Sequence, residues 1–438
     1  MKAIKFFSMA ALLAGLGAAA IAAAPEPAAI PPAIPSSTAQ KLYSSVRDDL
    51  LQVRVLLKSG RTQSSVGSGF LIGHSDLVVT NYHVVSQIAL EPETYVGEYV
   101  DTKSGRGAVE LLAVDVLHDL AVVRIGRKGS GVFNIAEHPQ TLTQGQYLYS
   151  LGNPLDLGFA ISEGTYNGIM SRGFSEQLMF TGAINAGMSG GPNVTVDGQV
   201  AGVNVAKRLD GELVSFLVPV RYVQELLKTV ADQKAPPANF KTVVGRQLLS
   251  YQSTMLDQLL ATPFTQKTLG PYQVPARESN QVRCWGRSEN KPELPFTLDH
   301  ITCSMESAIF VSDQLQTGHV SIRHEFSRST ELGALRFSKL ASNSFKNEDF
   351  GNNKDQNLTG PVCTERFVKN KNLPLRAVLC VRAYRKFAGL YDFALLTGST
   401  DESLMSLQSR IDAKGVSYEN GLRISRIFLE SIGRGNKS

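Results

Sequence analysis

Cysteine is scarce in this chain of 438 residues and is missing from its whole first half. No cysteine follows the apolar segment at the N-terminus, which leaves no attachment point there for a bacterial lipid anchor. The four cysteines are Cys284, Cys303, Cys363 and Cys380. An even number confined to one region predicts two structural disulfides if the chain is exported. Of the three pairings we favour Cys284–Cys303 and Cys363–Cys380, because partners close in sequence need the least loop closure.

Other features are also lacking. After residue 24 no stretch is long and apolar enough to cross a bilayer. The histidines of the second half, His300, His319 and His324, show no metal-ligand spacing with cysteines or carboxylates, so we expect no metal and no other cofactor. The net charge of +5 is not accompanied by an aromatic-interleaved or glycine-rich binding motif, so we expect no nucleic-acid partner.

The N-terminus has the layout of a secretory signal peptide. Lys2 and Lys5 precede an apolar run rich in alanine and leucine that ends in small residues at Ala24. We predict a signal peptide over residues 1–24 and, from its prolines, a stiff extended linker over residues 25–40. An uncleaved membrane anchor is the alternative, which the many alanines and glycines of the run disfavour. We therefore expect a secreted protein that resides in the bacterial periplasm.

Charge is distributed unevenly along the chain. Residues 241–438 contain 26 Lys and Arg against 19 Asp and Glu, whereas the first 240 residues contain 18 against 20. Seven basic residues are concentrated in one short segment: Arg366, Lys369, Lys371, Arg376, Arg382, Arg385 and Lys386. The cluster suggests docking to an anionic envelope surface or an acidic partner, and a solvated face is the alternative.

The segment Gly187–Pro192 (GMSGGP) has the composition of a nucleophile loop. A serine hydroxyl is a poor nucleophile at neutral pH, so it needs a base within hydrogen-bond reach and donors for the oxyanion that forms. The glycines on either side of Ser189 permit a sharp turn that aims two N–H groups at one point. Since glycine-rich turns are common, the interpretation depends on support from the rest of the chain.

Upstream, two segments predict short strands with a small-residue turn between them. They are Gly67–Ile72 and Leu77–Val85, and both are rich in β-branched residues. The second carries His83, whose side chain is suited to take and return a proton near neutral pH.

A carboxylate to orient this histidine is offered by the segment Asp115–Ile125. Asp119 stands at the start of an apolar strand, where it could be buried against an imidazole ring. Asp115 is a rival candidate, although the Asp-Leu-Ala-Val sequence favours Asp119. His118 between them is expected to be exposed.

Together these segments resemble the HtrA-type branch of the trypsin-like serine proteases. The family patterns T-N-x-H-V, D-L-A-V and G-N-S-G-G-P are matched at Thr80–Val84, Asp119–Val122 and, with one change, Gly187–Pro192. Further matches are Leu151–Pro154 and Gly202–Asn204. The resemblance covers about residues 41–230, which we assign as the protease domain.

The resemblance implies two six-stranded antiparallel β-barrels with the catalytic residues in the cleft between them. The many short apolar runs separated by Gly, Asn and Asp turns support an all-β first half independently. In the implied roles, Ser189 attacks the scissile carbonyl, His83 shuttles the proton, and Asp119 orients His83. The N–H groups of Gly187 and Ser189 would form the oxyanion hole.

Two positions depart from or refine the family pattern. Met188 stands where this branch has Asn, and a thioether cannot pair with a newly cut amino terminus. Ala183, six residues before the serine, would form the floor of the primary specificity pocket. An uncharged floor predicts preference for a small or medium apolar residue before the scissile bond. Ile184, Val203 and Asn204 are expected to shape the same pocket.

Beyond residue 230 the resemblance ends. We expect a polar, proline-bearing linker over residues 231–240 and an unfamiliar α+β domain over residues 241–438 that contains the disulfides. HtrA-type proteins usually continue into a PDZ domain, but Thr268–Gly270 is followed by Pro271 and makes no convincing carboxylate-binding loop, so no PDZ domain is predicted. The patterns predict helices at Gln247–Leu260, Ser403–Ile411 and Leu422–Ile432, and strands at Ile309–Val311, His319–Ile322, Ala377–Arg385 and Tyr391–Leu396.

These observations predict an exported serine endopeptidase that acts through an acyl-enzyme on protein or peptide substrates, with envelope protein processing or quality control as its setting. Two alternatives stay open. The first is a catalytically inactive protease-fold adaptor that binds peptides or envelope partners, and the second gives residues 241–438 the main role as a binding module.

Overall fold

The computed structural model describes residues 36–136, 141–170, 173, 175–207, 214–233, 235–345 and 355–435. The predicted signal peptide and residues 25–35 of the predicted linker lie outside this part. The first described element is helix α1 (Ser37–Val46), so the last four residues of the predicted extended linker are helical. Its buried side chains Ala39, Leu42 and Val46 are three or four residues apart and form one apolar face.

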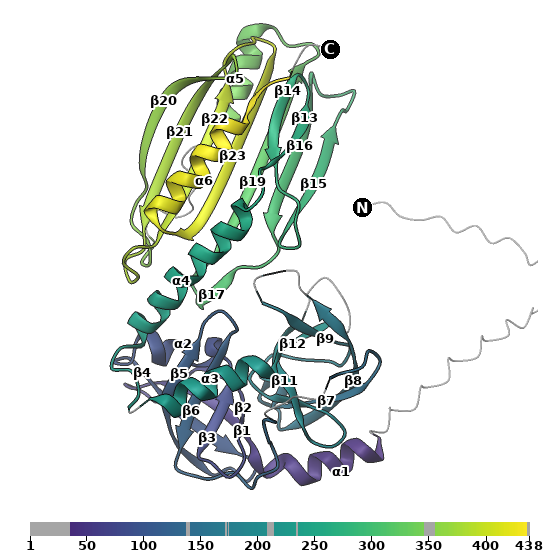
Figure 1. Cartoon of the computed structure of the whole chain (residues 1–438), viewed down its shortest axis with the longest axis vertical. Helices are drawn as coiled ribbons and strands as arrows, with labels where there is room; N and C mark the ends of the chain where they lie inside the picture. Colours follow the sequence, from purple (N-terminus) through teal and green to yellow (C-terminus); the bar gives the residue numbers. More distant parts are fainter. Residues whose placement is uncertain are drawn as a thin grey trace, which may run out of the picture. The chain divides into compact units, whose positions relative to one another are not determined.

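Two closed six-stranded antiparallel barrels make up the first half (Figure 1). The first, with strand order β1-β2-β3-β6-β5-β4, consists of β1 (Leu50–Leu57), β2 (Gln63–Leu71), β3 (Leu77–Thr80), β4 (Tyr95–Asp101), β5 (Arg106–Asp115) and β6 (Leu120–Ile125). The second, with order β10-β11-β12-β9-β8-β7, consists of β7 (Tyr147–Gly152), β8 (Ala160–Met170), β9 (Gln177–Phe180), β10 (Pro192–Val194), β11 (Val200–Lys207) and β12 (Ser215–Pro219). The predicted double barrel is confirmed.

Helices cover the outside of the barrels. Helix α3 (Val220–Asp232) follows β12 directly and packs on β5 and β6 of the other barrel. Helix α2 (Tyr82–Leu90) follows β3, so the predicted strand over residues 77–85 was wrong after Thr80. Val84 and Val85 favour strands intrinsically, but both are fully buried on this helix, so tertiary packing overrides propensity. Two short 3-10 turns, Arg47–Asp49 and Pro154–Asp156, complete this half.

The second half is built on a seven-stranded antiparallel sheet of order β15-β16-β19-β23-β22-β21-β20. Its strands are β15 (Val282–Glu289), β16 (Phe296–Met305), β19 (His319–Ser329), β20 (Val362–Asn370), β21 (Leu373–Ala383), β22 (Tyr391–Ser399) and β23 (Met405–Val416). Two smaller sheets accompany it, β13 (Thr265–Leu269) with β14 (Tyr272–Ala276) and β24 (Gly433–Arg434), and the hairpin of β17 (Ile309–Ser312) and β18 (Leu315–Thr317).

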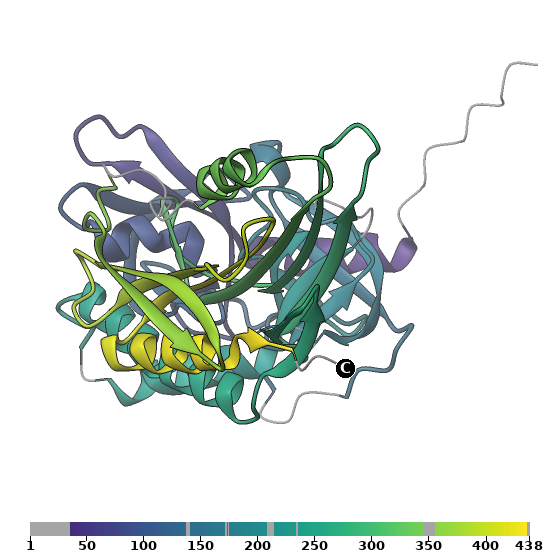
Figure 2. The ribbon, with the colours of Figure 1, turned by 90° about the horizontal axis from the view of Figure 1, so that it is seen from above.

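The described residues of this half form helices α4, α5 and α6. In Figure 2, α4 (Phe240–Leu260) and α6 (Tyr418–Ser431) lie along one face of the large sheet and α5 (Ala334–Ser344) lies on the other. The predicted α+β character and the predicted helices in α4 and α6 are confirmed. The helix predicted at Ser403–Ile411 was wrong, because this segment enters β23. β23 pairs with β19 and β22, and such central pairing on both edges decides its conformation.

Both disulfides of this half join neighbouring strands at directly opposite positions. Cys284–Cys303 connects β15 to β16, and Cys363–Cys380 connects β20 to β21. These are the pairings that short loop closure favoured. Since β15 and β20 are the two edge strands, each disulfide attaches one edge of the sheet to its inner neighbour.

The two halves share an apolar core. Residues 37–438 form one compact unit, and a single buried cluster contains Tyr82 and Val85 of α2 together with Val244 of α4 and Val311 of β17. Gln247 of α4 donates to the carbonyl of Val114 (2.7 Å) and accepts from the N–H of Val116 (3.0 Å). The second half therefore packs directly against the barrel that carries His83.

The basic residues of the second half do not form one free patch. Arg376 pairs with Glu365 (2.7 Å), Arg382 with Asp392 (2.9 Å), and Lys386 with Glu91 of the first half (2.9 Å). These pairs neutralise three of the seven charges locally. Docking to an anionic surface or acidic partner stays a prediction.

Candidate active site

His83 and Asp119 lie together at the end of the first barrel. Asp119 directly precedes β6 and His83 is the second residue of α2, so the barrel ladder brings the two segments side by side. The carboxylate of Asp119 holds His83 twice: Oδ2 lies 2.6 Å from ring Nδ1, and Oδ1 accepts the backbone N–H of His83 at 2.8 Å. Asp119 has a left-handed backbone (φ 53°), and its carbonyl accepts from Asn81 and Tyr82. The ring is therefore fixed with Nε2 as its free nitrogen.

The electrostatics of His83 follow from this pairing. Burial is the largest single influence on its pKa and lowers it. The charge of Asp119, its hydrogen bond to the ring, and the charge of Asp313 act in the opposite direction, and the net result is a pKa above the usual value. Asp313 belongs to the turn between β17 and β18, in the second half of the chain.

Asp115, the rival carboxylate, holds a different histidine. Its Oδ2 lies 2.5 Å from Nδ1 of His118. The His118 ring also stacks on Tyr222 of α3, with ring centroids 3.6 Å apart. The expectation that His118 is exposed was wrong, because this stacking and the Asp115 contact leave its side chain only 17% exposed.

Ser189 lies in a tight loop before β10. Its Oγ donates to the carbonyl of Val205 at 3.3 Å, and the described chain contains no hydrogen bond between Ser189 and His83. The loop nevertheless lies against the segment that carries His83. Gly190 has φ 85°, and a Cβ there would come within 2.9 Å of the Asn81 nitrogen, so only glycine fits.

Ser68 binds the backbone carbonyls of this loop, while two backbone N–H groups of the loop have no partner among the described residues. Ser68 donates its N–H to the carbonyl of Ser189 (2.7 Å) and its hydroxyl to the carbonyl of Gly187 (2.7 Å). Among the described residues, no hydrogen bond uses the N–H of Gly187 or of Ser189. A free pair of amides beside a serine is what an oxyanion requires.

Comparison with known proteins agrees with this geometry. Residues 67–203 match a family model described as "Trypsin-like peptidase domain". That range includes His83, Asp119 and Ser189. This segment is similar to trypsin-like peptidase domains, and the two barrels are called the peptidase domain below.

Relatives of the peptidase domain are HtrA-type serine proteases. Serine protease HTRA2, mitochondrial, of Drosophila ananassae is 33% identical over 189 residues, which is 41% of this chain and 42% of the relative. The protein of the same name from Drosophila erecta is 33% identical over 189 residues, 41% of this chain and 43% of the relative. The solved structure "Crystal structure of Deg5" is 23% identical, covers 44% of this chain and 94% of its own, and has a TM-score of 0.38. The chain spans less than half the length of the curated relatives it matches.

Met188, which stands where the family pattern has Asn, is buried in the second barrel. Its side chain is 2% exposed and packs in the core of the second barrel with Ile184 and Leu217. Its backbone closes the loop, since its N–H donates to Asn185 and its carbonyl accepts from Gly191. An apolar anchor here takes the position of the polar residue of the family pattern.

The residues predicted for the specificity pocket are spread over different environments. Ala183 is exposed, whereas Ile184 and Val203 are buried in barrel cores. Asn204 is fully buried, where it donates to Leu151 and Met188 and accepts from Ser150. Asn204 thus holds the serine loop through its hydrogen bonds. The assignment of Val203 and Asn204 to a pocket stays a prediction.

The structure also brings residues to the site that sequence reasoning missed. Phe310 of β17 meets the His83 ring edge-on, with centroids 6.0 Å apart. Tyr82 donates its hydroxyl to the carbonyl of Val311 at 2.8 Å. No sequence signal marks Phe310 or Val311, because they are more than two hundred positions away from His83 and belong to the half of the chain that the resemblance does not cover.

The described part of the chain gives two further negative findings. None of its helices combines the length and hydropathy that a membrane crossing requires. No group of three or more His, Cys, Asp or Glu side chains within it is placed to hold a metal ion.

Proposed function

We propose that this protein is an exported serine endopeptidase that uses Ser189, His83 and Asp119 as a catalytic triad. One observation carries the proposal: Asp119 fixes the ring and the backbone of His83, next to a serine loop in which the N–H groups of Gly187 and Ser189 donate to no other described residue. In the described conformation Ser189 Oγ donates to Val205, so rotation about its Cα–Cβ bond is needed to reach Nε2 of His83. Such rotation is a small change for a serine side chain.

The proposed reaction follows from the roles of these groups. His83 takes the proton of Ser189 as Oγ attacks the peptide carbonyl, and the N–H groups of Gly187 and Ser189 stabilise the oxyanion. His83 then gives the proton to the leaving amine, which releases one product and leaves an acyl-enzyme. A water molecule activated by His83 hydrolyses the ester and restores Ser189. Asp119 stabilises the imidazolium in both halves of the reaction.

The setting and preference are part of the same proposal. The uncharged Ala183 supports cleavage after small or medium apolar residues. The N-terminal sequence supports export to the periplasm, where envelope protein processing or quality control would supply substrates. HTRA2 proteins are serine proteases by name, and this likeness supports the peptidase activity of the matched segment.

A fluorophosphonate probe tests the proposal, since it labels only an activated serine. We expect labelling and peptide cleavage by the native chain, both abolished in Ser189→Ala, with turnover about 10⁶-fold lower. His83→Ala should reduce labelling strongly. Ser64→Ala, an exposed serine on β2, is the matched control and should behave as the native chain.

The opposite result identifies the adaptor alternative. A folded native chain that neither takes the probe nor cleaves any member of a peptide library, but retains peptides, would be an inactive binding protein. Cleavage after Lys or Arg would contradict the preference for apolar residues that the uncharged Ala183 predicts. It would not contradict the proposed catalytic roles of Ser189, His83 and Asp119.

A further inference from the structure

A pocket of about 600 Å³ lies between the peptidase domain and the second half of the chain. The side from the peptidase domain includes Asp119, Val205 and Val218, together with the polar residues His118, Ser175 and Gln177. The side from the second half consists of Arg283, Trp285 and residues 306–310. Neither half alone encloses this space.

The pocket adjoins each member of the proposed triad. It includes Asp119 itself, and it includes Phe310, whose ring contacts His83. It also includes Val205, whose carbonyl accepts the hydroxyl of Ser189 at 3.3 Å. A peptide held for attack by Ser189 therefore has neighbouring side chains within reach of the pocket.

The chemistry of the walls selects apolar side chains. Phe310, Val205 and Trp285 are apolar or aromatic, and the two charged side chains from the second half neutralise each other. Arg283 pairs with Glu306 at 2.7 Å and lies over the Trp285 ring, 4.3 Å from its centroid. On the peptidase side, Asp119 is paired with His83 at 2.6 Å and His118 with Asp115 at 2.5 Å. Among the described wall residues, the charged groups thus already have partners, so a charged substrate side chain would lose hydration here without gaining an unpaired opposite charge, which is costly.

The wall from the second half is held firmly at both ends. At one end Tyr82 of α2 bonds to Val311, and Ile309 and Leu315 are buried in the shared core. At the other end Thr317 closes β18 with a 2.6 Å hydrogen bond to the hydroxyl of Tyr384.

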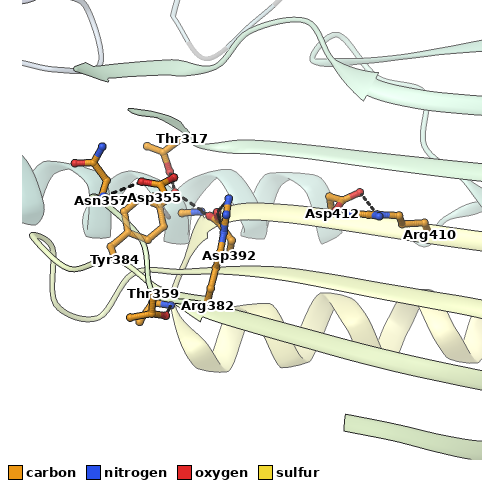
Figure 3. Close-up of polar contacts among 11 residues, drawn as sticks. Thr317, Asp355, Asn357, Thr359, Arg382, Tyr384, Asp392, Arg410 and Asp412 are labelled. Atoms are coloured by element: carbon orange, nitrogen blue, oxygen red, sulfur yellow. Dashed lines mark hydrogen bonds and ion pairs between the residues drawn. The ribbon is translucent and has the colours of Figure 1, made fainter. Parts of the chain in front are cut away.

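Tyr384 in turn belongs to a buried network, shown in Figure 3. Its hydroxyl donates to Asp392 Oδ1 at 2.8 Å, and Arg382 pairs with Asp392 Oδ2 at 2.9 Å. Gly415 donates its N–H to the same carboxylate at 3.0 Å. A hairpin fixed to both the large sheet and α2 is a rigid wall, which is what side-chain selection requires.

From this geometry we infer that the β17–β18 hairpin and Trp285 complete the substrate site of the peptidase, forming a pocket for a bulky apolar side chain near the scissile bond. The inference rests on the proposed endopeptidase function. It assigns to the second half of the chain a direct part in substrate selection, with Phe310 and Ala308 as specificity-determining residues.

The test uses two variants with opposite geometric effects in the full chain. Phe310→Ala widens the pocket, and Ala308→Trp, at an exposed position on its wall, fills it. A peptide library that varies one position at a time measures kcat/KM for each side chain. At one position near the scissile bond, Phe310→Ala should lower the preference for bulky apolar over small side chains about tenfold, and Ala308→Trp should exclude bulky side chains by a similar factor.

Two controls keep the outcomes separate. Phe367→Ala removes an aromatic side chain that is 73% exposed on β20, and should leave the profile unchanged. Fluorophosphonate labelling of every variant reports the serine independently of the pocket. Because Phe310 contacts the His83 ring, the kcat/KM values of each variant are compared after division by the labelling rate of the same variant, so that a change in serine reactivity is not read as a change in selectivity.

The inference is overturned if the native chain cleaves peptides and both pocket variants keep the native profile. It is also overturned if both variants change kcat/KM by one common factor for all peptides, because that indicates a structural or covering role for the hairpin. Absence of labelling and cleavage in the native chain would overturn the proposed function, and this inference with it.

Discussion

At the residue scale, His83 is the side chain whose surroundings matter most for function. Asp119 accounts for its orientation, while Asp313 adds a second negative charge from the opposite half of the chain. In its proposed role as the base, His83 must be neutral, and a raised pKa keeps it protonated to higher pH. Activity should therefore fall on the acid side below a pKa that exceeds 6.5, the ordinary value for histidine.

Asp313→Asn tests this electrostatic link. Removing the negative charge lowers the pKa of His83, so the acid limb of kcat/KM against pH should move to lower pH while the plateau stays unchanged. Asp197→Asn, an exposed aspartate in the turn before β11, is the control and should not move the limb. An acid limb identical in Asp313→Asn and the native chain would show that Asp313 has no influence on His83.

A second residue-scale prediction concerns the buried ion pair of Figure 3. Asp392→Ala leaves Arg382, 8% exposed, without its carboxylate and removes the acceptor of Tyr384. The free energy of unfolding should fall by about 3–5 kcal/mol in urea titrations. Glu365→Ala breaks the more exposed pair with Arg376 in the same sheet and should leave the free energy of unfolding close to that of the native chain, because solvent screens an exposed ion pair. Equal losses in the two variants would contradict the argument.

At the element scale, the large sheet depends on its two edge strands. An edge strand has hydrogen-bond partners on one side only and tends to open or to pair with other chains. Cys284–Cys303 and Cys363–Cys380 attach β15 and β20 to their neighbours and restrict such opening.

Replacing Cys363 and Cys380 together by Ser should destabilise the chain by about 3 kcal/mol, as expected for a closed loop of this length. Hydrogen exchange should rise in β20 and β21 but not in β15 and β16, which the other disulfide still joins. Uniform acceleration of exchange over the whole sheet would argue against a local effect on the edge.

At the scale of the whole molecule, the shared core couples the two halves. Tyr82 and Val85 of α2 are buried against residues of α4 and β17, so unfolding of the second half would expose the helix that carries His83. We therefore expect one cooperative transition rather than two.

Unfolding of the two halves can be followed separately. The fluorescence of Trp285, the single tryptophan, reports unfolding of the second half, and fluorophosphonate labelling of Ser189 reports unfolding of the first. The two urea midpoints should coincide in the native chain. Gln247→Ala removes two hydrogen bonds between the halves, and should lower the free energy of unfolding by about 2 kcal/mol. Both urea midpoints should therefore move together to lower urea concentration. Loss of labelling at a urea concentration that leaves Trp285 fluorescence unchanged would contradict the coupling.

The sequence by itself determined the parts of this protein that depend on local pattern and short motifs. Short apolar runs and turn residues predicted an all-β first half, and the resemblance to HtrA-type proteases implied the two barrels and the roles of His83, Asp119 and Ser189. It failed where environment overrides propensity: Ser403–Ile411 has helical spacing but enters a strand paired on both edges, and Val84 and Val85 favour strands but are buried on a helix. Only the tertiary structure decided that Phe310 contacts the His83 ring and that the charge of Asp313 acts on it, because contacts between distant segments depend on how two cores pack together. That packing leaves no trace in the local pattern around residues 306–317.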